Sequence, residues 1–89
     1  MAGILVKALD PNTFEVTVEA GSTTTHVVSV SADYAARLTG DKVGPAELVR
    51  HSFEFLLERE PNNSILRRFD LPVIARYFPE YEQVIKARL

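Results

Sequence analysis

Two different spacings of apolar residues divide the chain into a strand-like first third and a helical remainder. Phe14, Val16 and Val18 alternate with polar residues, as a half-buried strand requires. The apolar run Ile4–Leu9 precedes this segment and the β-branched run Thr24–Val30 follows it, with short turn sequences between them. The pattern therefore predicts an antiparallel meander of three strands, with the three alternating apolar residues facing inward.

A helical spacing extends from Pro45 to about Glu60. Its apolar side covers more than half of the circumference, whereas a helix on one neighbouring layer needs an apolar arc of only roughly 100°. Pro45 suits the first helical position, and Pro61 cannot continue the helix. We therefore expect a long central helix that is covered on two sides. Its apolar residues are Leu48, Val49, Ser52, Phe53, Phe55, Leu56 and Leu57, and its charged stripe is Glu47, His51, Glu54 and Glu58.

Shorter helices are predicted on both sides of the central one. Ser31 is a suitable N-cap for a helix that ends at Gly40. After Pro61, further short helices are expected over 65–69, from an Asp70 cap to Phe78, and over 80–89. The sequence thus predicts a single α+β domain over residues 1–89. A three-stranded meander packs on one side of the long helix, and short C-terminal helices pack on the other.

The composition is that of a globular protein without a strong charge preference. The chain is 46% hydrophobic and 25% charged, with a formal net charge of −2 and no cysteine. Nothing in it attracts nucleic acid or anionic lipid in general, and no run reaches transmembrane length. The absence of cysteine, with an apolar start that Lys7 interrupts, predicts a cytoplasmic location without membrane association.

One segment of the chain resembles a known group of sequences. The run from Ser52 to Tyr81, SFEFLLEREPNNSILRRFDLPVIARYFPEY, is similar to a segment of a family of short uncharacterised prokaryotic proteins, a domain of unknown function. The resemblance covers about a third of the chain, most clearly in EPNNSI and RYFPEY. It implies a prokaryotic origin, and it adds no activity and no site residue.

The side chains that could carry chemistry do not form a recognisable catalytic or metal site. Glu47, His51, Glu54 and Glu58 are of metal-ligating types, but along one straight helix they cannot converge on one ion. His51 and Ser52 point about 100° apart and cannot form a nucleophile–base pair. His26, alone on a strand, is expected to be partly exposed. We expect no catalytic residue, no metal and no cofactor, and hence no enzyme.

DNA binding is the alternative function, and it takes two forms. The strand near Val28, the short helix after it and the helix from Pro45 have the order of a ribbon-helix-helix repressor. The outward residues Thr25, Val27 and Ser29, however, offer no base-reading side chain. Residues 64–78 could instead form a helix-turn-helix, whose second helix offers only Arg76. Nucleic acid is therefore an improbable partner, although a small DNA-binding regulator stays the runner-up.

The C-terminal aromatic residues suggest a binding surface for protein. Phe69, Tyr77, Phe78 and Tyr81 form an aromatic cluster around Pro79, and Arg76 precedes Tyr77. Tyrosine is enriched at interfaces, although aromatic residues at helical spacing more often belong to the core, with their hydroxyl groups reaching water. We predict a non-enzymatic protein-interaction or self-association module, with Phe69, Arg76, Tyr77 and Tyr81 as partner-binding residues. Its partner is another protein or a second copy in a homodimer.

Overall fold

The N-terminal meander is confirmed, and a fourth strand joins it. The computed structural model describes residues 3–89, in which β1 (Gly3–Asp10), β2 (Thr13–Ala20) and β3 (Ser22–Ser29) pair antiparallel. The strand β4 (Arg68–Asp70) pairs parallel with β3, so the described sheet is mixed and has the order β1-β2-β3-β4. The predicted three-stranded sheet was therefore one strand too small.

The strand β4 occupies part of the segment for which the sequence predicted a helix. The 3₁₀ helix η1 (Asn62–Ser64) precedes an extended stretch, and residues 65–69 are not helical. The backbone N–H of Val27 donates to the carbonyl of Arg67 at 2.7 Å, and the N–H of Leu71 donates to that of Ser29 at 2.8 Å. Residues 68–70 form a strand despite their helical spacing, because the second edge of β3 offers backbone N–H and C=O groups that this segment can hydrogen-bond.

The first helix, α1 (Ala32–Thr39), begins and ends where the sequence indicates. The side chain of Ser31 accepts a hydrogen bond from the backbone N–H of Tyr34 at 3.1 Å. Gly40 ends the helix in the left-handed conformation with φ 61°, which glycine adopts without a Cβ clash. Tyr34 and Leu38 are buried on its inner side, as expected.

The central helix α2 (Pro45–Leu57) is shorter than predicted but is covered on two sides. It ends before Glu60 because Pro61 disfavours helical conformation in the residue that precedes it. On the sheet side, the Phe53 ring lies 5.3 Å from the ring of His26. On the other side, the Phe55 ring lies 5.3 Å from that of Tyr81. The two-sided apolar arc is therefore confirmed, whereas the helix is not long.

Two short helices complete the chain, α3 (Val73–Tyr77) and α4 (Tyr81–Arg88). Asp70 does not cap α3, contrary to the prediction. It belongs to β4, where its side chain accepts a hydrogen bond from the hydroxyl of Ser29. Pro72 takes the position before α3 instead, and α3 is accordingly shorter than the predicted segment to Phe78.

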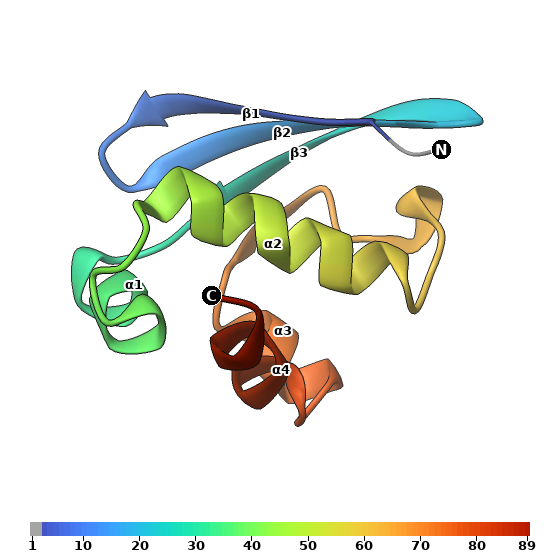
Figure 1. The fold of residues 1–89 in the computed structure, drawn as a ribbon. Helices are drawn as coiled ribbons and strands as arrows, with labels where there is room; N and C mark the ends of the chain where they lie inside the picture. The colour runs from blue at the N-terminus through green and yellow to red at the C-terminus, as the bar shows by residue number, and fades with distance from the viewer. Residues whose placement is uncertain (1–2) are drawn as a thin grey trace.

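The sheet, α2 and the C-terminal helices form successive layers, as Figure 1 shows. Cross-strand neighbours Phe14, Val28 and Phe69 occupy one row of the sheet and face α2. The buried apolar residues form one cluster that extends through α2 into α4. They are Phe14, Val16, Val18, Val28, Val30, Tyr34, Ala35, Leu38, Leu48, Val49, Phe53, Phe55, Leu56, Ile65, Leu71, Ile74, Tyr81 and Ile85.

Candidate functional site

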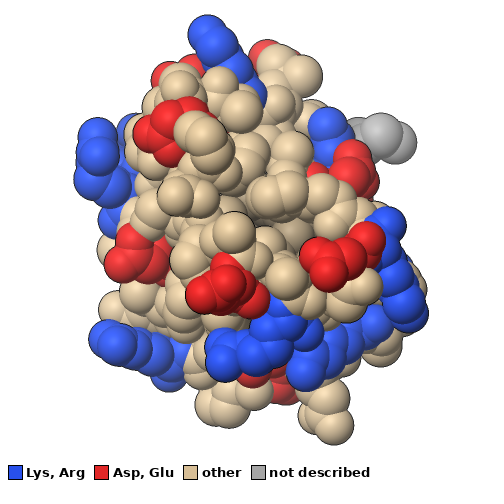
Figure 2. Space-filling view, turned by 90° about the vertical axis from the view of Figure 1, so that its left-hand side faces the viewer, with Lys and Arg blue, Asp and Glu red and all other residues tan. Residues whose placement is uncertain are grey.

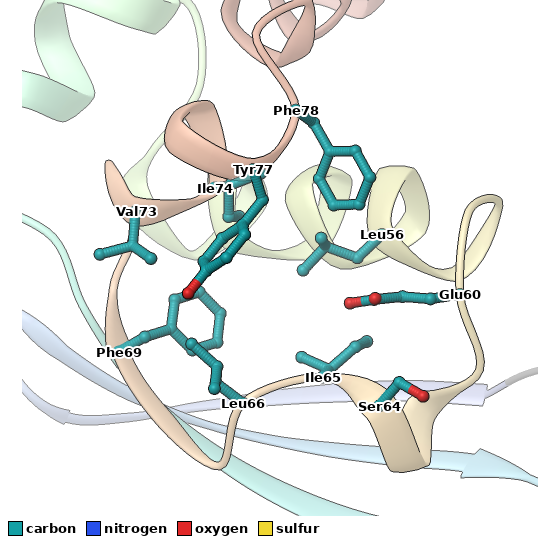
Figure 3. A pocket seen from close by; sticks show the side chains of 10 residues that line it. All are labelled: Leu56, Glu60, Ser64, Ile65, Leu66, Phe69, Val73, Ile74, Tyr77 and Phe78. Atoms are coloured by element: carbon teal, nitrogen blue, oxygen red, sulfur yellow. The ribbon is translucent and has the colours of Figure 1, made fainter.

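An open apolar groove lies between the C-terminal end of α2, the segment 64–66 and helix α3. It encloses about 330 Å³. In Figure 3 one wall comes from α3 and the other from the extended segment, with Leu56 of α2 between them. The lining residues are Leu56, Glu60, Ser64, Ile65, Leu66, Phe69, Val73, Ile74, Tyr77 and Phe78.

The base and the rim of the groove differ in exposure. Leu56, Ile65 and Ile74 are buried and belong to the core. Leu66 and Tyr77 are 48% and 67% exposed, so two large side chains leave apolar surface in contact with water beside the groove. In Figure 3 the two side chains approach each other at one end of the groove. The groove is thus a shallow opening of the core to the surface, and its rim exposes apolar side-chain surface to water.

A buried polar network fixes the wall that carries Leu66. The side-chain amide of Asn62 donates to the carbonyl of Ser22 at 3.1 Å and to the hydroxyl of Thr24 at 3.0 Å. His26 is fully buried, with Nε2 2.8 Å from the Thr24 hydroxyl and Nδ1 2.8 Å from the carbonyl of Leu66. Because a carbonyl only accepts, Nδ1 carries the proton and Nε2 accepts from Thr24. Three side chains from β3 and η1 therefore hold the extended segment in place.

The burial of His26 contradicts the expectation of a partly exposed side chain, and it has an electrostatic consequence. Burial lowers the pKa of His26 below its ordinary value of 6.5, because desolvation disfavours the charged imidazolium. The hydrogen bond to Leu66 opposes this effect, and the charge of Arg67 adds to it. His26 is therefore a neutral structural hydrogen-bonding residue near pH 7. It does not line the groove.

Aromatic contacts fix the wall that carries Tyr77. The Phe78 ring packs edge-on against Phe55 of α2, with 5.8 Å between centroids. The guanidinium of Arg59 lies 3.6 Å above the centroid of Phe55 on the same helix terminus. Arg59 also approaches Glu80, at 3.4 Å. These contacts hold α3 against α2 and leave Tyr77 on the surface.

One carboxylate closes the other end of the groove. Glu60 follows the end of α2, and its carboxylate points into the groove in Figure 3. Within residues 3–89 this carboxylate makes no hydrogen bond or ion pair. The groove therefore combines apolar walls with one carboxylate that no described residue pairs.

The predicted partner-binding residues fall into different places. Phe69 and Tyr77 line the groove, so the structure brings these two together. Arg76 is exposed on α3 beside Tyr77 but does not line the groove. Tyr81 is fully buried, and its hydroxyl lies 2.6 Å from that of Ser52. Burial places Tyr81 in the core and keeps it away from the rim.

Sequence reasoning missed Leu66 and Glu60 as groove residues. It assigned Leu66 to a helix that faces α2, so the side chain was counted as core. Glu60 was counted as part of α2, whereas it lies in the turn after that helix. The signal in the sequence is Pro61. A proline disfavours helical backbone in the residue before it, so Glu60 is not expected to continue the helix and its charged stripe.

The charged stripe of α2 lies on the surface. His51 is 3.1 Å from Glu54 and 3.9 Å from Glu47, all on α2. In the part of the chain that the structure describes, no three His, Cys, Asp or Glu side chains gather as a metal site would require. None of the described helices combines the length and apolar character that crossing a membrane demands.

The two arrangements considered for DNA binding find no structural counterpart in residues 3–89. A ribbon-helix-helix strand pairs across a dimer, but β3 already has β2 and β4 as neighbours. The segment 64–78 contains a strand and one five-residue helix rather than two helices. On the face that Figure 2 shows, acidic side chains lie close to the basic ones. A DNA-binding regulator therefore stays a prediction without support from the geometry.

Comparison of the chain with protein-family models, with curated proteins and with solved structures gives no match. The resemblance of residues 52–81 to short prokaryotic proteins therefore stays a prediction.

Proposed function

We propose that this protein is a non-enzymatic interaction module that binds a segment of a partner protein in the groove between α2 and α3. The observation that supports it is the exposure of Leu66 and Tyr77 at the rim of a cavity of about 330 Å³. Covering such side chains removes apolar surface from water, which is the main favourable contribution to protein association. Tyrosine is also enriched at interfaces. We place this activity in the cytoplasm, without a cofactor.

A concave site favours a protruding partner segment over a homodimer built on the same groove. In a two-fold dimer the same patch of each copy contacts the other. Two grooves that face each other leave space unfilled, and close packing is required for a stable interface. Such a dimer also places the two Glu60 carboxylates in one interface. A side chain from another protein fills the groove without either cost.

Selection of a displayed random peptide library on the immobilised protein tests this function. Leu66→Ser/Tyr77→Ser removes the exposed rim, and Leu5→Ser/Leu9→Ser is the matched control. The control residues are exposed leucines on β1 (Leu5 64%, Leu9 49%), away from the groove. We expect selected peptides to bind the wild type and the control variant and to lose at least about tenfold in affinity for the rim variant.

Two outcomes would contradict the proposal. Peptides that bind the rim variant as well as the wild type would place the binding surface elsewhere. A stable dimer in light scattering at high micromolar concentration, abolished by Leu66→Ser/Tyr77→Ser, would assign the groove to a second copy instead. Circular dichroism of both double variants establishes that they are folded.

A further inference from the structure

We infer that the partner segment presents a lysine or arginine next to the apolar side chain that enters the groove, and that this cation pairs with Glu60. The inference rests on the proposed function and specifies the chemistry of the partner. It follows from the contrast between Glu60 and the other carboxylates of the same region.

The neighbouring carboxylates are paired within the chain, whereas Glu60 makes no ion pair with any residue of the described range 3–89. Glu58 lies 2.6 Å from a guanidinium nitrogen of Arg88, and Glu80 lies 3.4 Å from Arg59. The Arg88 hydrogen bond is the main cause that lowers the pKa of Glu58. Glu60 is half-buried and has no such partner within residues 3–89. Its pairing capacity is therefore free for another molecule.

The position of Glu60 decides the charge of the occupant. Its carboxylate points toward the apolar walls in Figure 3, so a segment that fills the groove removes water from it. Desolvation of a carboxylate is costly unless a cation or another donor replaces the lost water. A purely apolar segment leaves this cost uncompensated, and an acidic segment adds repulsion. A lysine or arginine compensates it with a charge-assisted hydrogen bond.

The lining explains why the cation must accompany an apolar side chain. Glu60 is the only Asp, Glu, Lys, Arg or His among the ten lining residues. Leu66, Phe69 and Tyr77 line the groove away from the carboxylate end. A cation alone would contact only one end of the groove, and an apolar side chain alone would contact only the other.

A second copy of the chain is the competing occupant. Strand β1 is at the edge of the sheet, and it exposes Leu5 and Leu9 with Lys7 between them. This edge has the same combination of apolar and cationic side chains. Its insertion into the groove of another copy would be a head-to-tail contact, which continues into open chains unless the rotation closes. The test below therefore includes a measurement of self-association.

The experiment compares random heptapeptide selections on the wild type, on Glu60→Gln and on Glu47→Gln. Glu47 is an exposed carboxylate of α2 that lies outside the groove, so it is the matched control. We expect lysine or arginine to be enriched beside an apolar residue on the wild type and on Glu47→Gln. On Glu60→Gln the apolar preference remains and the basic preference disappears.

One enriched peptide and its Lys→Gln or Arg→Gln version are then titrated against the three proteins. We expect Glu60→Gln to weaken binding of the basic peptide about tenfold, as expected for loss of a hydrogen bond to a charged group. The neutral peptide should bind Glu60→Gln at least as tightly as the wild type, because the variant has no carboxylate to desolvate. Loss of the preference for the wild type shows that the two changes remove the same contact.

Each outcome bears on a different statement. Groove-dependent peptides without a basic preference would overturn the role of Glu60 and leave the proposed function intact. Failure to select any peptide that depends on Leu66 and Tyr77 would overturn the proposed function itself. Self-association in sedimentation equilibrium that both Lys7→Gln and Glu60→Gln abolish would replace the partner segment by a second copy.

Discussion

The sheet lies on one side of α2 and the C-terminal segments lie on the other. Different kinds of contact hold α2 to the sheet and to the C-terminal segments. On the sheet side, the buried alternating residues Phe14, Val16 and Val18 belong to the same apolar cluster as Phe53 of α2. The C-terminal segments combine a few aromatic contacts, such as Phe78 against Phe55, with single polar links, such as that between Tyr81 and Ser52. Regular apolar packing leaves no opening, whereas segments fixed at separate points leave the groove between them.

The difference has a consequence for where binding can occur. An interface of interdigitated apolar side chains is close-packed and changes shape with difficulty. Short elements that are fixed at a few points have backbone that opens more readily. The groove lies between two such short elements, η1 and α3, while the residues at its base belong to the close-packed core.

The largest effect is expected from Phe53→Ala, which tests the apolar side of the comparison. Phe53 is fully buried and contacts the rings of His26 and Phe69. Deletion of a buried phenylalanine side chain costs about 3–5 kcal/mol of unfolding free energy. Urea unfolding followed by circular dichroism measures this cost. A loss below about 1 kcal/mol would show that this side of α2 is not packed as described.

Asn62→Ala tests the polar links that hold the segment after η1, and it should lower the unfolding free energy by less than Phe53→Ala does. The carbonyl of Ser22 and the hydroxyl of Thr24 lose their shared donor, while Thr24 keeps its hydrogen bond to His26. Two hydrogen bonds are lost, and together they contribute about 1–3 kcal/mol. Hydrogen exchange should accelerate in residues 62–70 more than in β1 and β2. Asn63→Ala is the control, because Asn63 is exposed and its side chain accepts only the solvent-exposed hydrogen bond from the hydroxyl of Ser22, so stability should change by less than about 0.5 kcal/mol. Uniform acceleration over the whole chain would contradict a separate polar contribution.

Tyr81→Phe isolates one hydrogen bond between α4 and α2. The Ser52 hydroxyl still donates to the carbonyl of Leu48 at 2.7 Å, so only the bond from Tyr81 is lost. We expect destabilisation by about 0.5–1.5 kcal/mol, the usual net contribution of such a bond. Tyr77→Phe, at an exposed position, should leave the unfolding free energy unchanged in the same urea experiment. Equal effects of the two changes would contradict the burial of Tyr81.

The smallest expected effect is a dependence of stability on pH that comes from His26. Its pKa in the folded state lies below 6.5 because the side chain is buried. The unfolded chain therefore binds the proton first, and the contribution of His26 is fully present above pH 6.5. It is lost as the pH falls from 6.5 through the lower pKa of the folded state.

Urea unfolding at pH values from 8 to 5 measures this loss. His26→Gln should flatten the dependence between pH 6.5 and 5, whereas His51→Gln at the surface should retain it. A steeper fall for His26→Gln than for the wild type would contradict the assigned direction of the pKa shift.

Much of the first half of the fold could be predicted because its signals are local. Alternation along β2, the Ser31 cap and the left-handed Gly40 each depend on a few neighbouring residues. The two-sided coverage of α2 could also be predicted, since the width of the apolar arc is a property of one helix. The third strand was predicted, but the pairing of its second edge with β4 was not.

The groove could be predicted only in part. Phe69 and Tyr77 were identified as partner-binding residues from their aromatic character, and both line it. Tyr81 has the same character but is buried, because its ring packs on Phe55 and its hydroxyl reaches Ser52. Aromatic residues of a short helix do not reveal from spacing alone which of them faces the core.

The sequence by itself determined the meander, the extent of α1 and the need of α2 for two neighbours, because turn chemistry, capping and periodicity act within a few residues. Only the tertiary structure decided that residues 68–70 pair with β3 and that His26 is buried beside Leu66. Both depend on contacts across about forty residues, in which an unpaired strand edge and a buried imidazole find their hydrogen-bonding partners. The wall of the groove that carries Leu66 results from this long-range pairing.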